Sequence, residues 1–241
     1  MKKKRLPPEF TFAGIIVAPS GVFNLLGKVI NGIAEFENRG ASIITHDPFR
    51  FYSSKYVKNY GKGFNLKDFV NKIKPRSRQE NINLVNLLKF FPQRSGPFLQ
   101  EFKPEFLPYG QDYLFKCSAQ FAYIDQNGKK RIVLFQTHKN YVDKLVRFGL
   151  VAAMARIRYC KNDFKDALIQ IVDCGVPPSM KGRRLKVYNE EDLPKFSEQQ
   201  VDAALALYVA AREEMEKEGF QPRKTQKKRP PKDPRQQDLW P

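Results

Sequence analysis

Between Lys129 and Val172 the spacing of the apolar residues changes once, and this change limits the possible folds more than any other feature of the chain. Residues 131–137 form a short β-rich run, which indicates a strand. From Asn140 the apolar side chains recur at helical spacing, which indicates one buried helical face: Tyr141, Leu145, Phe148, Val151, Ala152 and Ala155. Asn162 is placed to cap a second short helix, with the apolar residues Phe164, Ala167, Leu168, Ile171 and Val172. The segment therefore predicts the order strand, helix, helix.

This order, with Lys129, Lys130 and Arg131 entering the strand, resembles the ribbon-helix-helix family of DNA-binding proteins. In that family two chains pair their strands into an antiparallel ribbon that enters the major groove, so the resemblance implies a homodimer on double-stranded DNA. Because a strand alternates its faces, Gln136 and His138 would point together toward the bases. The DNA-binding residues that the resemblance implies are Lys129, Lys130, Arg131, Gln136, His138, Lys139, Lys161 and Asn162.

Two features depart from that family. The first helix is longer than usual, and the strand carries Val133, Leu134 and Phe135 in succession. A strand that is apolar on both faces is at least as typical of a buried core strand. The sequence therefore leaves two interpretations open, a ribbon that contacts DNA and a strand of the core.

The charge of the chain points to a polyanionic partner. Lys and Arg number 43 against 25 Asp and Glu, which gives a formal net charge of +18 and an isoelectric point near 9.8. Neutralising phosphates with such a surface releases counterions and supplies most non-specific affinity for DNA. The basic start MKKKRLPPEF is followed by no apolar stretch, and no run approaches the ~20 apolar residues of a membrane helix. We therefore expect a cytoplasmic nucleic-acid-binding protein without a membrane partner.

Proline and charge divide the remaining sequence. The elements expected before a proline-rich connector at 92–108 are a strand at 10–17, an amphipathic helix at 22–36, and short helices at 66–73 and 82–91. After it, Ser197 and Gln200 form a capping box that starts another helix. The expected fold is a mainly helical α+β protein with a ribbon-helix-helix-like element and a disordered basic C-terminal tail. Its regions are 1–100, with the first strand and helices, 109–218, with the DNA-binding element and last helix, and the tail 219–241.

Aromatic and basic residues are interleaved between Arg39 and Lys62, among them Phe51, Tyr52 and Lys55. Such interleaving is suited to stacking bases while pairing phosphates. Rings at this spacing more often form a helix core that is surrounded by lysine side chains.

Two fainter resemblances concern longer stretches and the end of the chain. The phrases INGIAEF, HDPFRFY, SAQFAYID and VPPSMKGRRLKVY resemble the AcaB-like transcriptional regulators of conjugative plasmids and integrating elements, which implies a regulator of conjugative-transfer genes. The ending resembles the short motif with which bacterial replication and repair proteins dock on the sliding clamp, with Gln236, Leu239 and Trp240 as the clamp-binding residues. This second resemblance implies the clamp as a partner.

Residues 116–139 also form a candidate hairpin around the turn Asp125-Gln126-Asn127-Gly128. With the helices around it, this hairpin resembles the core of restriction-type and phage-exonuclease-type nucleases, which need a carboxylate on the first strand and an acid-x-Lys on the second to hold magnesium. Here Gln136, Thr137 and His138 stand where the acid is required, and Asp125 lies in the turn. No zinc-ligand spacing and no glycine-rich phosphate loop occurs in the sequence. The expectation is therefore no enzyme and no cofactor.

These features predict a sequence-specific, dimeric transcription regulator that binds DNA through a β-ribbon, with activation and repression left open. The alternative is a replication or repair accessory protein, an inactive relative of the nucleases, that docks on the clamp.

Overall fold

The centre of the molecule is a five-stranded mixed sheet with the order β2-β5-β6-β7-β8. The computed structural model describes residues 4–5, 7–18, 20–38, 47–59, 65–71, 73–91, 97–103, 105–138, 144–177 and 180–220. The strands of this sheet are β2 (Phe98–Glu101), β5 (Phe121–Ile124), β6 (Lys130–Gln136), β7 (Leu168–Asp173) and β8 (Lys186–Asn189). The central strand β6 runs antiparallel to β5 and parallel to β7.

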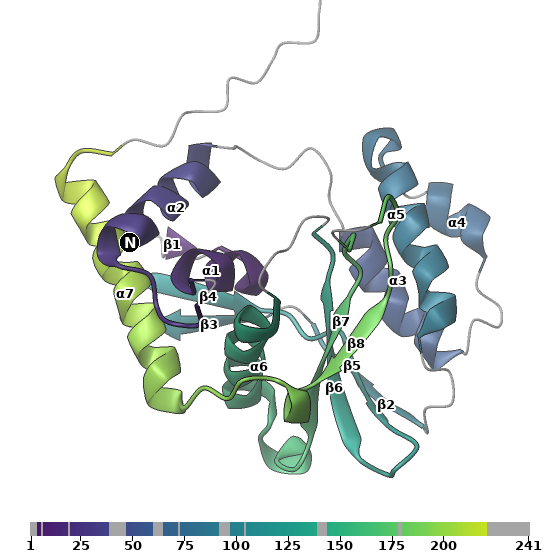
Figure 1. The fold of residues 1–241 in the computed structure, drawn as a ribbon. Coiled ribbons are helices and arrows are strands. Elements are labelled where there is room, and N and C mark those ends of the chain that lie inside the picture. Colours follow the sequence, from purple (N-terminus) through teal and green to yellow (C-terminus); the bar gives the residue numbers. More distant parts are fainter. Residues whose placement is uncertain are drawn as a thin grey trace, which may run out of the picture.

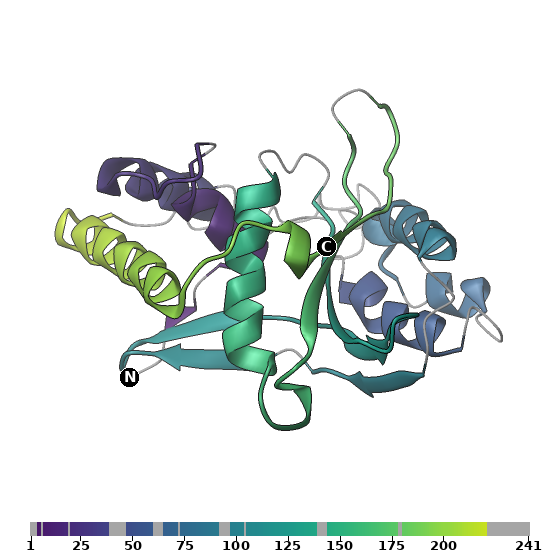
Figure 2. The ribbon, with the colours of Figure 1, turned by 60° about the horizontal axis from the view of Figure 1, so that its bottom comes forward.

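Helices cover both faces of this sheet (Figures 1 and 2). On one face lies α6 (Lys144–Tyr159), which connects the parallel strands β6 and β7, together with α1 (Glu9–Ile16), α2 (Leu26–Asn38) and α7 (Glu198–Lys217). On the other face lie α3 (Asp47–Lys58), α4 (Leu66–Asn71) and α5 (Pro75–Leu87). A parallel pair of strands needs such a crossover, and the crossover helix buries one face of the sheet.

A second, three-stranded sheet extends the first face. It has the order β1-β4-β3, from β1 (Lys4–Arg5), β4 (Tyr113–Cys117) and β3 (Glu105–Tyr109). In Figure 1 it lies beside α1 and α7. Its inward side chains Phe115 and Cys117 belong to the same apolar cluster as α1, α6 and α7.

The predicted DNA-reading ribbon is wrong, because β6 is a core strand. Ile132 and Leu134 pack on the α6 face and Val133 and Phe135 on the α3–α5 face, and all four are fully buried. Both edges of the strand are also paired, with β5 and with β7. The apolar run therefore has the cause that its composition allowed, burial on both faces, and it has no face or edge left for a groove or a second ribbon.

The second predicted helix is also wrong, and with it the ribbon-helix-helix fold class. Residues 162–164 form only a short 3₁₀ turn, and Leu168–Asp173 is the strand β7. Its β-branched residues Ile169, Ile171 and Val172 fit a strand, and the parallel pairing with β6 adds the hydrogen bonds that local spacing cannot reveal. The five-stranded mixed sheet with seven helices replaces the expected element.

Near the N-terminus the expected strand at 10–17 is the helix α1. Its residues are apolar on all sides, which periodicity alone cannot assign to helix or strand. Phe10, Phe12 and Ile16 are fully buried because α1 is enclosed by α6, α7 and the small sheet. A helix that is apolar all round is a buried helix.

Two predictions from local chemistry are confirmed. The hydroxyl of Ser197 accepts a hydrogen bond from the backbone N–H of Gln200, whose side chain returns one to Ser197, and α7 starts there. The turn at Asp125–Gly128 joins β5 and β6 as a hairpin, with Gly128 at φ +75°. Asp125 accepts hydrogen bonds from the backbone N–H groups of Asn127 and Lys129 and so fixes the turn.

The expected regions 1–100 and 109–218 contribute to the same packing units. Helices α1 and α2 share one apolar cluster with α6 and α7, and helices α3 to α5 share the other with β5, β6 and β7. Residues 221–241 lie outside the described part of the chain. Within the described part, no helix has both the length and the apolar character required to cross a membrane.

Candidate functional site

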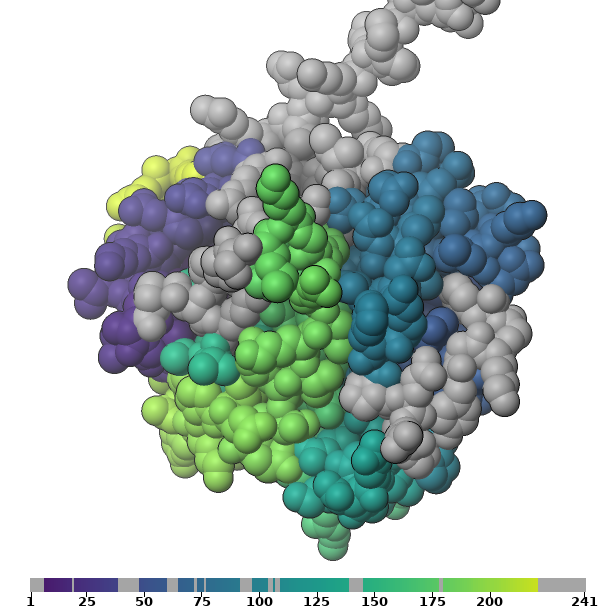
Figure 3. Space-filling model, turned by 45° about the vertical axis from the view of Figure 1, so that its right-hand side comes forward, coloured from purple at the N-terminus to yellow at the C-terminus, as the bar shows by residue number. Residues whose placement is uncertain are grey.

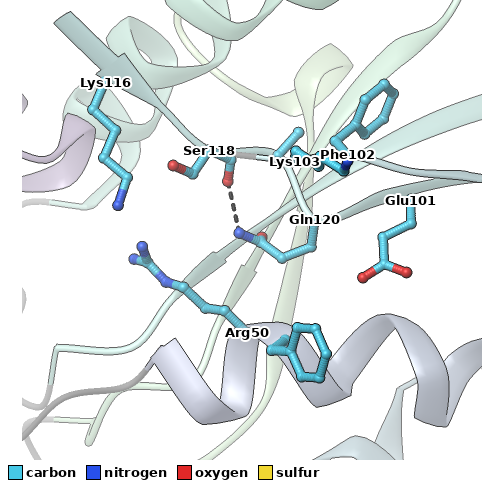
Figure 4. A pocket seen from close by; sticks show the side chains of 9 residues that line it. Arg50, Glu101, Phe102, Lys103, Lys116, Ser118 and Gln120 are labelled. Carbon is cyan, nitrogen blue, oxygen red and sulfur yellow. Dashed lines mark hydrogen bonds between the residues drawn. The ribbon is translucent and has the colours of Figure 1, made fainter. Parts of the chain in front are cut away.

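A cavity of about 580 Å³ opens between α3, the end of β2 and the chain that joins β4 to β5 (Figure 4). Helix α3 contributes Arg50 and Phe51, and the link from β4 to β5 contributes Lys116, Ser118 and Gln120. The end of β2 and the residues after it complete the wall with Glu101, Phe102 and Lys103. Three elements that are distant in sequence therefore meet at one hollow.

Two cations face the same space in this cavity. Figure 4 shows the amine of Lys116 and the guanidinium of Arg50 directed toward each other beside Ser118. Both side chains are half-buried. Among the described residues the buried Nε of Arg50 has no hydrogen-bond partner, and neither has the buried hydroxyl of Ser118. Buried polar groups are nearly always paired, so these two groups mark a place that is built to hold a polar ligand.

A buried carboxyl lies behind the two cations. Glu9, the first residue of α1, is fully buried, and within the described chain neither of its carboxylate oxygens has a hydrogen-bond partner. Burial raises the pKa of this carboxyl above its ordinary value, and the positive charges of Arg50 and Lys116 oppose the shift. To the extent that Glu9 holds a proton, the cavity carries a net positive charge.

An amide closes the floor of the cavity. Gln120 is buried; its Nε2 donates to the carbonyl of Ser118 at 2.7 Å, and its Oε1 accepts from the backbone N–H of Phe135 at 2.8 Å. The side chain thus supplies a link that the ladder between β5 and β6 lacks at this point. Gln120 fixes the backbone of Ser118 and with it the position of the hydroxyl.

The end of β6 carries a second amide. Gln136 is fully buried, donates to Asp173 Oδ1 at 3.3 Å and to the carbonyl of His138 at 3.1 Å, and accepts from the backbone N–H of His138. Asp173 also accepts from the N–H of Gly175 at 2.9 Å. Gln136 is therefore a structural tie between β6 and β7 and does not point toward a base.

The next residue of functional interest, His138, lies where the cavity side of β6 meets the segment after β7. The protein atoms around its ring lower its pKa, and the positive charges of Arg50 and Arg183 lower it further. Arg183 in turn donates to the carbonyls of Thr137 and Cys174 and pairs with Glu80 of α5 at 3.0 Å. Figure 3 shows the green segment near residue 183 resting against the blue helices on this face.

The basic residues at the other end of β6 have protein partners. Arg131 is 5% exposed and pairs with Asp125 at 2.7 Å and Glu191 at 2.8 Å, and Lys129 also reaches Glu191 at 3.5 Å. Lys130 donates to the carbonyl of Asp163 at 2.6 Å. These three residues form a network that fixes the hairpin end of the sheet.

The remaining predicted residues are not gathered into one surface. Lys161 and Asn162 are exposed on the turn after α6, with Asn162 at φ +50°. The strand β6 separates the hairpin end from Gln136 and His138, by ~20 Å at about 3.3 Å per residue. Lys139 and the predicted clamp residues Gln236, Leu239 and Trp240 lie outside the described residues.

The sequence analysis missed the cavity residues. Glu9, Arg50 and Lys116 belong to three elements, and nothing local links them. The available signals were a carboxylate at the start of an otherwise apolar helix and the phrase HDPFRFY, which contains Arg50. Among the described residues, no three His, Cys, Asp or Glu side chains gather as ligands of a metal would.

Comparison with known proteins adds one partial similarity. No protein-family model matches the chain, and no curated protein matches it. The crystal structure of a "putative exonuclease" from Eubacterium rectale is similar over 88% of this chain and 81% of its own, with 12% sequence identity and a TM-score of 0.39. We transfer no residue role from a similarity of this size.

Proposed function

We propose that the protein binds nucleic acid by holding a backbone phosphate in the cavity between Arg50 and Lys116, and that it does not cleave the bound strand. One observation carries the proposal: two converging cations share a hollow with buried donors, Arg50 Nε and the Ser118 hydroxyl, that have no partner among the described residues. A phosphate oxygen accepts from all of these groups, and charge-assisted hydrogen bonds of this kind are the strong ones. The net charge of +18 supports the same class of ligand.

The amides at the strand ends support binding without cleavage. Metal-assisted hydrolysis of a phosphodiester needs carboxylates on neighbouring strands of such a hairpin. Gln120 and Gln136 occupy the cavity end of β5 and β6, and both amides are engaged in hydrogen bonds to the protein. An amide carries no charge with which to bind magnesium or activate water.

This arrangement favours the accessory protein over the ribbon regulator. Contacts from Arg50 and Lys116 to phosphate fix a strand in place and carry no information about its base sequence. A non-cleaving relative of the nucleases in replication or repair fits such contacts. Docking on the sliding clamp would depend on Gln236, Leu239 and Trp240, for which the described residues offer no test.

The experiment combines a binding assay with a cleavage assay. Labelled single-stranded and duplex DNA are incubated with the protein and Mg²⁺ or Mn²⁺ and then analysed for retention and for length. We expect retained, full-length DNA. Arg50→Glu should weaken binding roughly tenfold or more, because a charge-assisted contact is lost.

The matched control is Lys165→Glu, an exposed position away from the cavity that changes the net charge equally. It should weaken binding by less than about threefold, as expected for a screened surface charge. Equal losses in the two variants would reduce the effect to net charge and overturn the phosphate site. Shortened DNA would overturn the absence of cleavage.

A further inference from the structure

The wall of the cavity continues into a path of rings and cations on α3. Phe51 lines the cavity and is 54% exposed, which is unusual for so large an apolar side chain. The ammonium group of Lys55 lies 4.6 Å from the centre of its ring. One turn further, Lys58 lies 5.8 Å from the ring of Phe98 on β2. Residues 51, 55 and 58 share one face of the helix.

The depth of the polar groups limits which nucleic acid can reach them. Ser118 is 2% exposed and Gln120 is 6% exposed, so the cavity floor lies below the surface. A volume of about 580 Å³ is that of a small-molecule pocket and is far too small for a double helix. A phosphate can approach Ser118 and Arg50 closely only on a strand that has no partner strand in the way.

We propose, building on the phosphate site above, that the preferred ligand is single-stranded nucleic acid. One phosphate lies between Arg50 and Lys116, the neighbouring base stacks on Phe51, and the backbone continues past Lys55 and Lys58. Base–aromatic stacking combined with a basic groove is the general means by which proteins hold single strands without sequence preference. Every base has a face that can stack, so the site requires no particular sequence.

Phe51→Ala tests the stacking directly, because an exposed side chain can be removed with little effect on the fold. Fluorescence anisotropy with a labelled dT₁₂ strand and with a 12-base-pair duplex measures both affinities. Phe51→Ala should weaken binding of the single strand roughly tenfold and leave binding of the duplex unchanged. The quenching of a 2-aminopurine base in the strand should also be lost.

Phe90→Ala is the matched control. Phe90 is 62% exposed and has Lys89 at 5.0 Å from its ring, and it does not line the cavity. This variant should leave both affinities unchanged. If Phe51→Ala behaves like Phe90→Ala, or if the unmodified protein prefers the duplex, the single-strand inference is overturned while the phosphate site stands. If the unmodified protein binds neither DNA, the proposed function itself fails.

Discussion

The assignment of β6 as the central strand can be tested with two neighbouring residues. Val133 and Leu134 point to opposite faces of the sheet, and both are fully buried. In a strand with one face at the surface, only one of two adjacent side chains would be buried. Leu134→Ala should therefore cost about 2–5 kcal/mol of unfolding free energy. Val133→Ala removes two methyl groups, so it should cost about 2 kcal/mol.

Urea unfolding followed by circular dichroism measures both effects. With a slope of roughly 1–3 kcal/mol per molar urea, each variant should lower the midpoint by about 1 M or more. Leu145→Ala is the control, because Leu145 on α6 is 51% exposed, and its cost should stay within about 0.5 kcal/mol. If either Val133→Ala or Leu134→Ala is as stable as the control, the strand has a free face and the argument against the ribbon fails.

Three further predictions follow from the same contacts. Gln120→Ala should cost about 1–3 kcal/mol of unfolding free energy, because it leaves the buried N–H of Phe135 without its acceptor, and urea unfolding measures this. The folded state raises the pKa of Glu9, so its contribution to stability should be fully present below the ordinary pKa of 4.5 and be lost as pH rises through the window above it. Unfolding free energies across pH should therefore show a decline for the unmodified protein that is absent in Glu9→Gln. Removing residues 221–241, which contain seven Lys and Arg, should make the salt dependence of DNA binding shallower without abolishing binding; an unchanged slope would show that this segment makes no phosphate contacts.

Features set by neighbouring residues could be predicted from the sequence, and features set by distant ones could not. The capping box at Ser197 and the hairpin turn at Gly128 depend on a few adjacent residues, and both predictions are confirmed. The apolar residues of 164–172 are compatible with a helix and with a strand. Pairing with β6, which lies across the crossover helix α6, decides for a strand. No local spacing contains that information.

The candidate site shows the same limit more strongly. The sequence correctly suggests a polyanionic ligand class for which the cavity is suited, but it assigned binding to Arg131 and Gln136, whose partners are Asp125, Glu191 and Asp173. Basic and amide side chains near a strand have the same sequence signature whether they bind a ligand or tie the fold together. The convergence of Arg50 with Lys116 becomes visible only when α3 and β4 are packed on the sheet.

The most direct test of the central claim compares two pairs of cations by the salt dependence of binding. The logarithm of the affinity for single-stranded DNA is measured against the logarithm of the salt concentration for Arg50→Ala/Lys116→Ala and for Lys129→Ala/Lys161→Ala. Each lost phosphate contact on a single strand lowers the slope by about 0.7. The account predicts a shallower slope and a large loss of affinity for the cavity pair, and almost no change for the pair from the rejected ribbon. The reverse result, with the ribbon pair controlling affinity and slope, would contradict it.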